Sequence, residues 1–393
     1  MRRLLVLASA IVFVDVAFFA AITPLLPSYV DDLGLTRGEA GILTGAYAAG
    51  TLLASLPAGL LVVRAGHRVA VLGGLALLGL ASLGFGLAES AWALDLARFG
   101  QGVGSALTWA GALSWLIDSA GAERRGEVIG TAFGAAVAGA LLGPVIGGLA
   151  DEIGTEPVFG SVVIVAVVLG ALAMRLPAPP RGEGTPPSLA AMRERPVVAA
   201  AAVLFVPSLT FGAVAVVVPL RIDELGGGAA VVAAGFTAGA ALETVLSPLV
   251  GRFSDRRGRR APISAGLLIC AAGIVVVPLA DAVGLVLGAL IVVSVGAGFA
   301  FSPAMAALSD AAEGVGLPQA FAAALLNMAW AAGQVTGSTG SGAAAEALGY
   351  TAPCVVLAAV LAFTAVRVAP RPVRPERFAP GAGRAPAPGR ESP

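Results

Sequence analysis

Twelve long apolar runs constrain the fold of this chain more than any other feature of its sequence. Each is long enough for a helix that crosses a bilayer, which needs about 20 apolar residues. Hydrophobic residues make up 58% of the chain and charged residues only 12%, so little sequence remains for a soluble domain. The length of the runs also favours helices over barrel strands, which predicts an all-α membrane protein. The runs lie near residues 4–30, 40–63, 68–88, 91–117, 127–150, 157–176, 196–220, 229–250, 261–280, 283–308, 318–343 and 350–368.

The arginines predict how these helices are oriented in the membrane. All 24 basic residues are Arg. If both termini lie inside, only Arg37 and Arg221 fall in outer loops, and Arg98 falls within a run. The remaining arginines then lie on the cytoplasmic side, which is the pattern of the positive-inside rule. Because the first run continues past the length of a secretion signal and contains Asp15, we expect it to remain as a helix.

A ten-residue word occurs twice and indicates that the chain is built from two repeats. GRFSDRRGRR at 251–260 has a degraded twin, GLLVVRAGHR, at 59–68, which is 192 positions earlier. Both words lie between apolar runs, so each predicts a short hairpin on one side of the membrane. Two further pairs of words align in the same order, LIDSAG at 116–121 with LSDAAE at 308–313 and, with a small register shift, GPVIGGLADEIG at 143–154 with GQVTGSTGSGAAAEALG at 333–349.

The repeat predicts where the chain divides. A segment rich in Pro, Gly and charge separates two sets of six runs, and a tail rich in Pro, Arg and Gly follows the last run. We therefore expect a six-helix bundle over 1–176, a cytoplasmic linker over 177–195, a second bundle over 196–368 and a disordered cytoplasmic tail over 369–393.

These words resemble the major facilitator superfamily, whose inner-loop motif reads G-x-L-x-D-R-x-G-R-R. The resemblance covers residues 4–368 and implies two pseudo-symmetric six-helix bundles with both termini inside. The second copy carries the motif nearly complete, and Asp255 could bind a helix N-terminus or an arginine as a latch. The glycines Gly251 and Gly258 would permit a tight turn. The alternative is that the arginines only anchor the topology.

The first copy of the motif lacks its central acid, because Val63 stands there. Asp118 could supply a charge to Arg64 or Arg68 instead. The hairpin and helix-end residues predicted to take part in gating are Gly59, Arg64, Gly66, Arg68, Asp118, Gly251, Asp255, Arg256, Gly258, Arg259 and Asp310.

The fourth run contains LDLARFGQGVGSA at 94–106, which resembles a superfamily word with Arg98 and Gln101. An arginine within a span costs about 2.5–3.5 kcal/mol on insertion scales, so we expect it to face a cavity or a partner. At 1.5 Å per residue, Arg98 lies about 10 Å from the outer end of its helix and Asp15 about 16 Å from the inner end of its own. In a core about 30 Å thick the two could therefore meet. Alternatively, Arg98 bonds backbone carbonyls in a structural role.

The fifth run contains GALLGPVIGG at 139–148, which resembles a motif of the antiporter branches of the superfamily. Gly139, Gly143 and Gly147 recur every fourth residue and form a stripe without side chains. Pro144 removes a helical hydrogen bond and bends the stripe, and Gly148 completes the word. The resemblance implies that the two halves pivot here, although a simple packing face would use the same glycines.

The first run, VDVAFFAAITPLLPSY at 14–29, resembles the first helix of drug:proton antiporters and vesicular amine transporters. That resemblance implies that Asp15 handles protons and cationic substrates. Glu243 in the eighth run is the second acid well inside a span. Burial favours the neutral form of both acids, so both could carry protons, and a nearby Arg98 opposes this at Asp15. Glu243 could instead be a packing residue bonded to Thr or Ser.

Aromatic and amide side chains could complete a substrate site. Asn327, Trp330 and Gln334 share one side of the eleventh helix, Trp109 lies in the fourth, and Phe18 lies one turn from Asp15. Aromatic rings beside an acid suit a lipophilic cation, although rings in a helix bundle also serve simple packing.

Three functions can be weighed on these residues. The first is a proton-coupled exporter of small amphipathic or cationic molecules, of the multidrug type. The second is a facilitator that takes up a metabolite such as a sugar or an organic anion. The antiporter-like GPxxGG word argues against it, and Arg98 as the one intramembrane anion anchor disfavours carboxylates and phosphates. The third is a non-transporting membrane protein. The sequence has one His, no catalytic triad, no metal cluster and no phosphate loop, which disfavours an enzyme.

The predicted partners follow from the first function. They are a small-molecule substrate, protons and the lipid bilayer, with no nucleic acid, no cofactor and no metal. We expect a monomer that passes many times through the inner (plasma) membrane.

Overall fold

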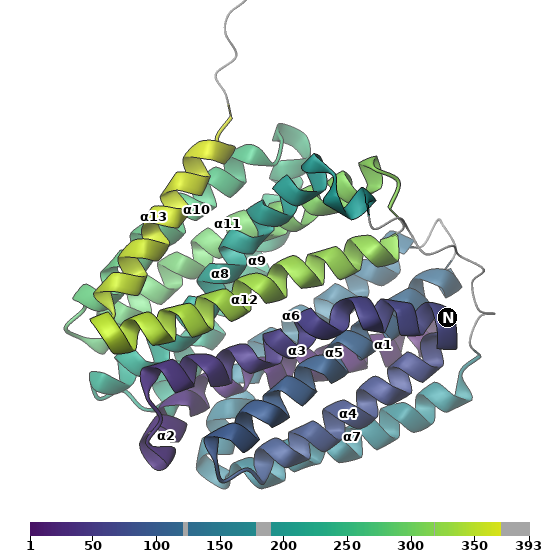
Figure 1. The fold of residues 1–393 in the computed structure, drawn as a ribbon, viewed down its shortest axis with the longest axis horizontal. Coiled ribbons are helices and arrows are strands. Elements are labelled where there is room, and N and C mark those ends of the chain that lie inside the picture. Colours follow the sequence, from purple (N-terminus) through teal and green to yellow (C-terminus); the bar gives the residue numbers. More distant parts are fainter. Residues whose placement is uncertain (121–124, 178–189, 318, 371–393) are drawn as a thin grey trace, which may run out of the picture.

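The structure is a computed structural model that describes residues 1–120, 125–177, 190–317 and 319–370. Within these residues all regular secondary structure is helical (Figure 1). Each of the twelve predicted runs contains a helix, which confirms the predicted fold class. The helices are α1 (Arg2–Ala20), α2 (Ile22–Leu33), α3 (Arg37–Ala65), α4 (His67–Gly86), α5 (Ala91–Ala120), α6 (Arg125–Ile153), α7 (Thr155–Arg175), η2 (Ala191–Arg193), α8 (Arg195–Glu224), α9 (Ala229–Arg257), α10 (Arg260–Val276), η3 (Val277–Leu279), α11 (Val283–Gly314), α12 (Gln319–Leu348) and α13 (Thr351–Val368).

Most of these helices could cross a bilayer. By length and composition, 10 spans in the described residues qualify, and α1 and α2 together form the first of them. The other two predicted spans, α5 and α12, are not among these ten, and they carry polar site residues such as Arg98 and Gln334. Large apolar side chains such as Ile164 on α7 and Phe363 on α13 are exposed on the outside of the bundle, as lipid contact requires.

The first predicted span is broken near its middle. α1 ends at Ala20 and α2 begins at Ile22. Pro24 has no N–H with which to bond the carbonyl of Ala20, so the helical ladder is interrupted there. The break leaves the carbonyls in the last turn of α1 open to a side-chain donor.

The two halves, α1–α7 and α8–α13, lie against each other in Figure 1, with α12 along their boundary. The repeat is visible in how their helices pack. A Cβ on Gly139 would lie 2.5 Å from the carbonyl oxygen of Phe13, and one on Gly333 would lie 2.5 Å from that of Phe205. Gly333 follows Gly139 by 194 positions, whereas Phe205 follows Phe13 by 192. The structure therefore shifts this pair by two residues from the 192-residue repeat and makes Gly333 equivalent to Gly139, not to Gly143, with which the aligned word begins.

The glycine stripe of α6 packs directly on the first span. A Cβ on Gly143 would lie 2.6 Å from the carbonyl oxygen of Ala17, and one on Gly147 would lie 2.0 Å from that of Ala21. No side chain fits at these distances, so the two backbones approach as the sequence predicts. Gly148 lies beside the stripe, where a Cβ would be 3.2 Å from the Cβ of Ala233 on α9. The α6 helix thus joins α1 within its half and α9 in the other half.

Both arginine-rich words end in the same backbone conformation. Gly66 has φ +90° and Gly258 has φ +91°, a region that side-chain-bearing residues rarely adopt. The two turns occupy equivalent places between α3 and α4 and between α9 and α10. The prediction that Gly251 helps to form the turn is wrong, because Gly251 lies inside α9 and Gly59 lies inside α3.

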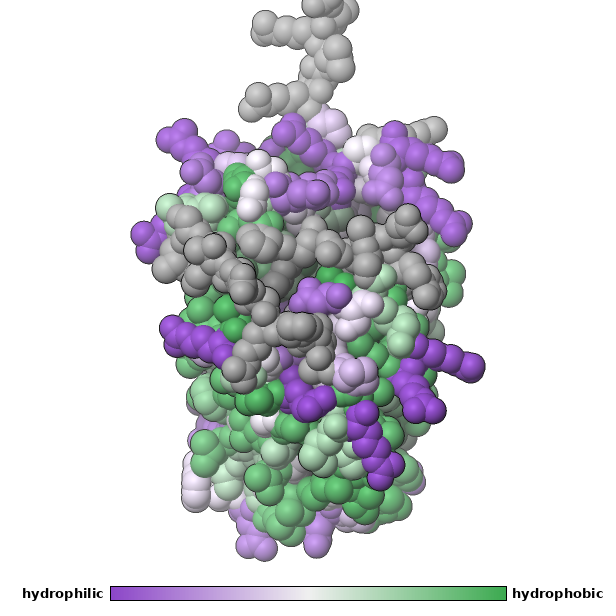
Figure 2. Space-filling model, turned by 90° about the vertical axis from the view of Figure 1, so that its right-hand side faces the viewer, coloured by the Kyte–Doolittle hydropathy of each residue, from purple (hydrophilic) through white to green (hydrophobic). Residues whose placement is uncertain are grey.

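The bundle has two ends, which we call the basic face and the opposite face. The basic face carries the N-terminus, the turns at Gly66 and Gly258, and Asp118 and Asp310. The opposite face carries the turns after α2 and α8. Figure 2 views the basic face end on and shows hydrophilic side chains gathered there, most densely over the half that holds α8–α13. The assignment of the basic face to the cytoplasm stays a prediction.

Candidate functional site

Asp15 lies at the centre of a buried hydrogen-bond network in the first half. Its side chain is 1% exposed. The hydroxyl of Tyr47 on α3 donates to Asp15 Oδ1 at 2.9 Å. The hydroxyl of Ser105 and the indole N–H of Trp109, both on α5, donate to Oδ2 at 2.7 and 2.6 Å. Three helices therefore meet at one carboxyl group.

The two oxygens of Asp15 differ in what they can do. Trp109 has a donor and no acceptor on its ring nitrogen, so Oδ2 must accept from it. The Tyr47 hydroxyl can both donate and accept. A proton placed on Oδ1 would require this hydroxyl to turn, so that its oxygen accepts the proton. The network therefore suits an acid that gains and loses a proton at Oδ1.

Arg98 is fully buried, and its guanidinium group bonds the backbone of α1 next to the break in the first span. Its Nη1 donates to the carbonyl oxygen of Phe18 at 3.3 Å and to Gln101 Oε1 at 2.9 Å, and its Nη2 donates to the carbonyl oxygen of Phe19 at 3.2 Å. Gln101 in turn donates to Ser82 Oγ at 3.0 Å. These two carbonyls lie in the last turn of α1. Arg98 thus closes the break, and Gln101 ties it to α4.

The structure does not bring Arg98 and Asp15 into an ion pair. Tyr47 stands between them, with its hydroxyl on Asp15 and its ring 5.0 Å from the Arg98 guanidinium carbon. The meeting inferred from depth is therefore indirect, and the backbone role is the one observed. Depth along two helices says nothing of rotation about them, which decides where the side chains point.

Aromatic rings from both halves meet beside this network. Phe19 on α1 contacts Tyr47 with ring centroids 4.7 Å apart and Trp330 on α12 at 5.4 Å. Trp109 packs edge-on against Phe133 at 5.7 Å. Trp330 is half-buried and joins the halves. The rings and Asp15 form a mixed aromatic and acidic surface that could hold an organic cation.

Phe18 is a correction to the predicted site. It is 9% exposed and packs edge-on against Phe159, with ring centroids 5.4 Å apart, inside the core of the first half. Its neighbour Phe19 takes the predicted place beside Asp15. In a helix, the side chain four residues after Asp15 points more nearly in the direction of Asp15 than the side chain three residues after it. Sequence reasoning also missed Tyr47 and Ser105. Ser105 could have been found, because it lies seven residues after Arg98 on the same side of α5.

The amide residues of α12 differ in their settings. Gln334 is 8% exposed. A Cβ on Gly212 would lie 2.3 Å from the backbone carbonyl oxygen of Gln334, so α12 and α8 are in contact there. Asn327 is half-buried. Neither amide side chain forms a hydrogen bond within the described part of the chain. Their predicted contact with substrate stays a prediction.

Glu243 lies on α9, outside the network of Asp15. It is half-buried and faces α11, where a Cβ on Gly298 would lie 3.6 Å from its Cγ. The predicted bond to Thr or Ser is not found among the described residues. The neighbouring Thr244 donates instead to the carbonyl oxygen of Ala240. The structure thus leaves Glu243 as an acid without an internal partner in those residues.

Charged and polar side chains join the halves at the opposite face. Glu224 at the end of α8 accepts from Arg37 Nη2 on α3 at 2.5 Å, from the hydroxyl of Tyr350 at 2.9 Å and from Arg221 at 3.1 Å. Burial and the neighbouring Glu224 raise the pKa of Tyr350, so its hydroxyl stays a donor at physiological pH. Arg37 also lies 4.5 Å from the Tyr350 ring centroid. We name Arg37, Arg221, Glu224 and Tyr350 the opposite-face cluster.

The backbones are equally close beneath this cluster. Gly38 N–H donates to Glu346 Oε2 at 2.9 Å. A Cβ on Gly41 would lie 2.6 Å from the carbonyl oxygen of Ser338, and one on Gly45 would lie 2.7 Å from Ser338 Oγ. The ends of α3 and α12 near the opposite face are therefore packed together without space between them.

The model of the Major Facilitator Superfamily matches residues 8–317 and 200–391. This chain belongs to the major facilitator superfamily. The superfamily consists of multi-pass membrane transport proteins and not of enzymes, as the sequence predicts. Two solved structures of a bacterial homologue of the human lysosomal transporter Spinster each share its fold, with TM-score 0.75. They are 15% and 17% identical and cover 93% and 94% of this chain and 96% and 98% of theirs.

Curated relatives match part of the chain. The multidrug resistance protein MdtG of Escherichia fergusonii is 32% identical over 44% of this chain and 45% of its own length. The quinolone resistance protein NorA of Staphylococcus aureus is 26% identical over 40% of this chain and 41% of its own. The MFS-type transporter ppzB of Metarhizium majus is 31% identical over 40% and 36%. The chain thus spans less than half the length of each of these relatives.

The inner-loop motif of the superfamily forms ion pairs on the basic face. Arg259 Nη2 contacts Asp310 Oδ2 at 2.6 Å, and His67 Nε2 contacts Asp118 Oδ2 at 3.1 Å. Arg68 donates to the carbonyl oxygen of Leu176. The expectation that Asp118 serves Arg64 or Arg68 is therefore wrong. The chain reverses between α3 and α4, and this brings the first residue of α4 next to α5.

Asp255, the predicted latch of the second motif, is exposed. No ion pair or hydrogen bond reaches its side chain from the described residues. Arg64 and Arg256 are exposed as well. In this conformation the contacts that fasten the hairpins come from the ends of the two words. The latch role of Asp255 stays a prediction for another conformation.

Proposed function

We propose that this transporter is a proton-coupled exporter of small amphipathic or cationic molecules, of the multidrug type, in the inner (plasma) membrane. The observation that carries the proposal is Asp15, a buried carboxyl group held by three donors and without a direct cationic partner. Such a carboxylate can take up a proton or pair with a bound cation, because its three donors are uncharged groups that do not cancel its charge. The names of NorA and MdtG support a drug-type substrate.

Asp15 would couple the proton flux to the substrate flux because its carboxylate holds either a proton or a cationic substrate, one at a time. When the site faces outward, Asp15 Oδ1 takes a proton, and the Tyr47 hydroxyl turns to accept it. When the site faces inward, the proton leaves and the carboxylate again accepts all three donors. A cationic substrate can then bind against Phe19, Trp109 and Trp330.

The energy of one proton is enough for useful export. One charge that moves through about 100 mV releases about 2.3 kcal/mol. At about 1.4 kcal/mol per decade, this supports a gradient of roughly 50-fold for each proton. A single titrating carboxyl group at Asp15 can therefore drive the cycle, and Glu243 would be a second, optional site.

Proton flux in proteoliposomes tests the role of Asp15. We expect wild-type protein to move protons when a lipophilic cation such as ethidium is added, and Asp15→Asn to lose this flux because the amide cannot titrate. The matched control is Asp281→Asn, which removes an exposed acid in the loop between η3 and α11 and should behave as wild type. Equal proton flux in Asp15→Asn and wild type would rule out Asp15 as the coupling site.

A further inference from the structure

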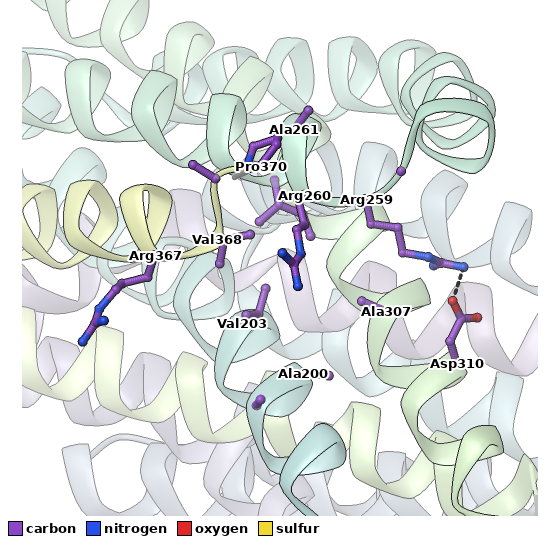
Figure 3. A pocket seen from close by; sticks show the side chains of 14 residues that line it. Ala200, Val203, Arg259, Arg260, Ala261, Ala307, Asp310, Arg367, Val368 and Pro370 are labelled. Atoms are coloured by element: carbon purple, nitrogen blue, oxygen red, sulfur yellow. Dashed lines mark ion pairs between the residues drawn. The ribbon is translucent and has the colours of Figure 1, made fainter. Parts of the chain in front are cut away.

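His67 is the single histidine of the chain and stands where the other half has an arginine. It lies 192 positions before Arg259, and its partner Asp118 lies 192 positions before Asp310. The two pairs are therefore equivalent in the repeat. Figure 3 shows Arg259 reaching Asp310 from the turn before α10, at the edge of a cavity of about 740 Å³. In the first half, the equivalent helices α4 and α5 are joined by His67, a side chain that can lose its charge near neutral pH.

The hydrogen-bond partners of His67 can accommodate two protonation states of its ring. Nε2 contacts Asp118 Oδ2 at 3.1 Å, and a carboxylate can only accept. Nδ1 lies 2.9 Å from Ser114 Oγ, and the Ser114 hydroxyl donates to the carbonyl oxygen of Ala110. Because that hydroxyl has one hydrogen, Nδ1 donates to it whenever the hydroxyl is turned to Ala110. In that arrangement both ring nitrogens donate, and the ring is an imidazolium ion.

The alternative arrangement needs only a small change. If His67 is neutral, it keeps the N–H on Nε2, and the Ser114 hydroxyl turns from Ala110 to donate to Nδ1. The ion pair with Asp118 is then lost, and a neutral hydrogen bond remains. Arg259 has no such second state, because a guanidinium group stays charged.

Few charged groups can compete with Asp118 for this ring. His67 is 7% exposed, and the Asp118 side chain is 53% exposed. On the helices packed around it, the charged residues near the basic face are Arg64 on α3, Arg68 on α4 and Arg175 on α7. Arg64 is exposed and Arg68 is bound to the carbonyl oxygen of Leu176, and no contact joins any of the three to the ring among the described residues.

We propose that His67 is a proton-binding site on the basic face, distinct from Asp15, which fastens α4 to α5 when it is protonated and releases them when it is not. The second half fastens the equivalent helices, α10 and α11, at all physiological pH values through Arg259 and Asp310. The first hairpin of the transporter is then sensitive to the pH on its own side of the membrane, whereas the second is not.

Nuclear magnetic resonance of the full chain tests the site directly. After removal of any histidine tag, ¹⁵N-histidine labelling reports on His67 alone. We expect a titration in which Asp118→Asn lowers the midpoint by about one pH unit, since the ion pair holds the proton. Asp310→Asn, the equivalent change in the other half, should leave the midpoint unchanged. A midpoint that Asp118→Asn does not move, or that Asp310→Asn moves equally, would overturn the proposal.

Thermal unfolding of the purified protein tests whether the proton fastens the hairpin. The ion pair with Asp118 requires the protonated ring, so the part of the stability that comes from this pair is present at low pH and lost as the pH rises. We expect the melting temperature of wild type, relative to Asp118→Asn, to fall by about 2 °C between about pH 6 and pH 8. Arg259→His, relative to the double variant with Asp310→Asn, should acquire the same dependence. A difference that is constant with pH would contradict the proposed fastening.

The effect on transport rests on the proposed function. In proteoliposomes we expect the rate to depend on the pH at the basic face in wild type and to lose that dependence in His67→Arg, with Asp15 unchanged. The resonance and melting measurements need no transport, so a failure of the exporter hypothesis would not be mistaken for a failure of the His67 site.

Discussion

At the scale of single residues, the site depends on which groups can both give and receive a proton. Asp15 is surrounded by three donors, but only the hydroxyls can reverse their direction. The indole N–H of Trp109 cannot, so it fixes the orientation of the carboxyl group. Arg98 contributes through Tyr47 and the backbone of α1, and not by a direct ion pair.

Variants at Tyr47 and Trp109 should therefore impair different steps of transport. We expect Tyr47→Phe to retain substrate binding and to reduce proton flux, because Oδ1 loses the hydroxyl that follows its proton. Trp109→Phe should weaken binding of a lipophilic cation by about tenfold or less, since it removes one hydrogen bond to a charged group, worth about 1.5 kcal/mol. Binding by fluorescence and proton flux in proteoliposomes, measured on both variants, distinguish the two. Identical profiles would contradict this division of roles.

At the scale of helices, glycines decide how closely the spans approach. The stripe on α6 and the pair Gly333 and Gly337 on α12 place backbone against backbone in the two halves. The sequence predicted the stripe from spacing alone, because a four-residue period puts small residues on one side of a helix. It could not predict the partner helix. The gating role of the stripe stays a prediction.

Two glycines on α6 offer a matched pair of variants. A Cβ on Gly147 would lie 2.0 Å from the carbonyl oxygen of Ala21, whereas nothing lies within 4 Å of a Cβ on Gly134. We expect Gly147→Ala to lower the melting temperature by several degrees or to prevent folding, since overpacking costs about 1–3 kcal/mol. Gly134→Ala should be neutral or slightly stabilising, because alanine favours the helix. Equal melting temperatures for the two variants would show that the close approach does not constrain the fold.

At the scale of the whole molecule, contacts between the halves are strongest at the opposite face. The opposite-face cluster and the packed ends of α3 and α12 hold that side closed. A transporter that works by alternating access must open them to expose Asp15 to the other side. The basic face, in contrast, is fastened within each half by the His67–Asp118 and Arg259–Asp310 pairs.

Loss of the opposite-face cluster should therefore shift the population of conformations. Glu224→Gln weakens the ion pair to Arg37, which joins the two halves, is partly exposed and contributes about 1 kcal/mol. We expect about a fivefold increase in the fraction of molecules open at that face. Spin labels on the ends of α3 and α12 would measure the distance distribution, with Asp281→Asn as control. An unchanged distribution in Glu224→Gln would show that the cluster does not hold the halves together.

The sequence alone determined the class of the molecule, because the length and apolarity of the runs leave a bilayer few alternatives to helices. It also determined the duplication, the turn at Gly258, the stripe on α6 and the buried acid at Asp15. Only the tertiary structure decided the partners. Phe19 replaces Phe18, Tyr47 separates Arg98 from Asp15, and Asp118 binds His67. These outcomes depend on helix rotation and on a break at Ala21, which shift a side chain by several ångströms without changing the pattern of apolar residues.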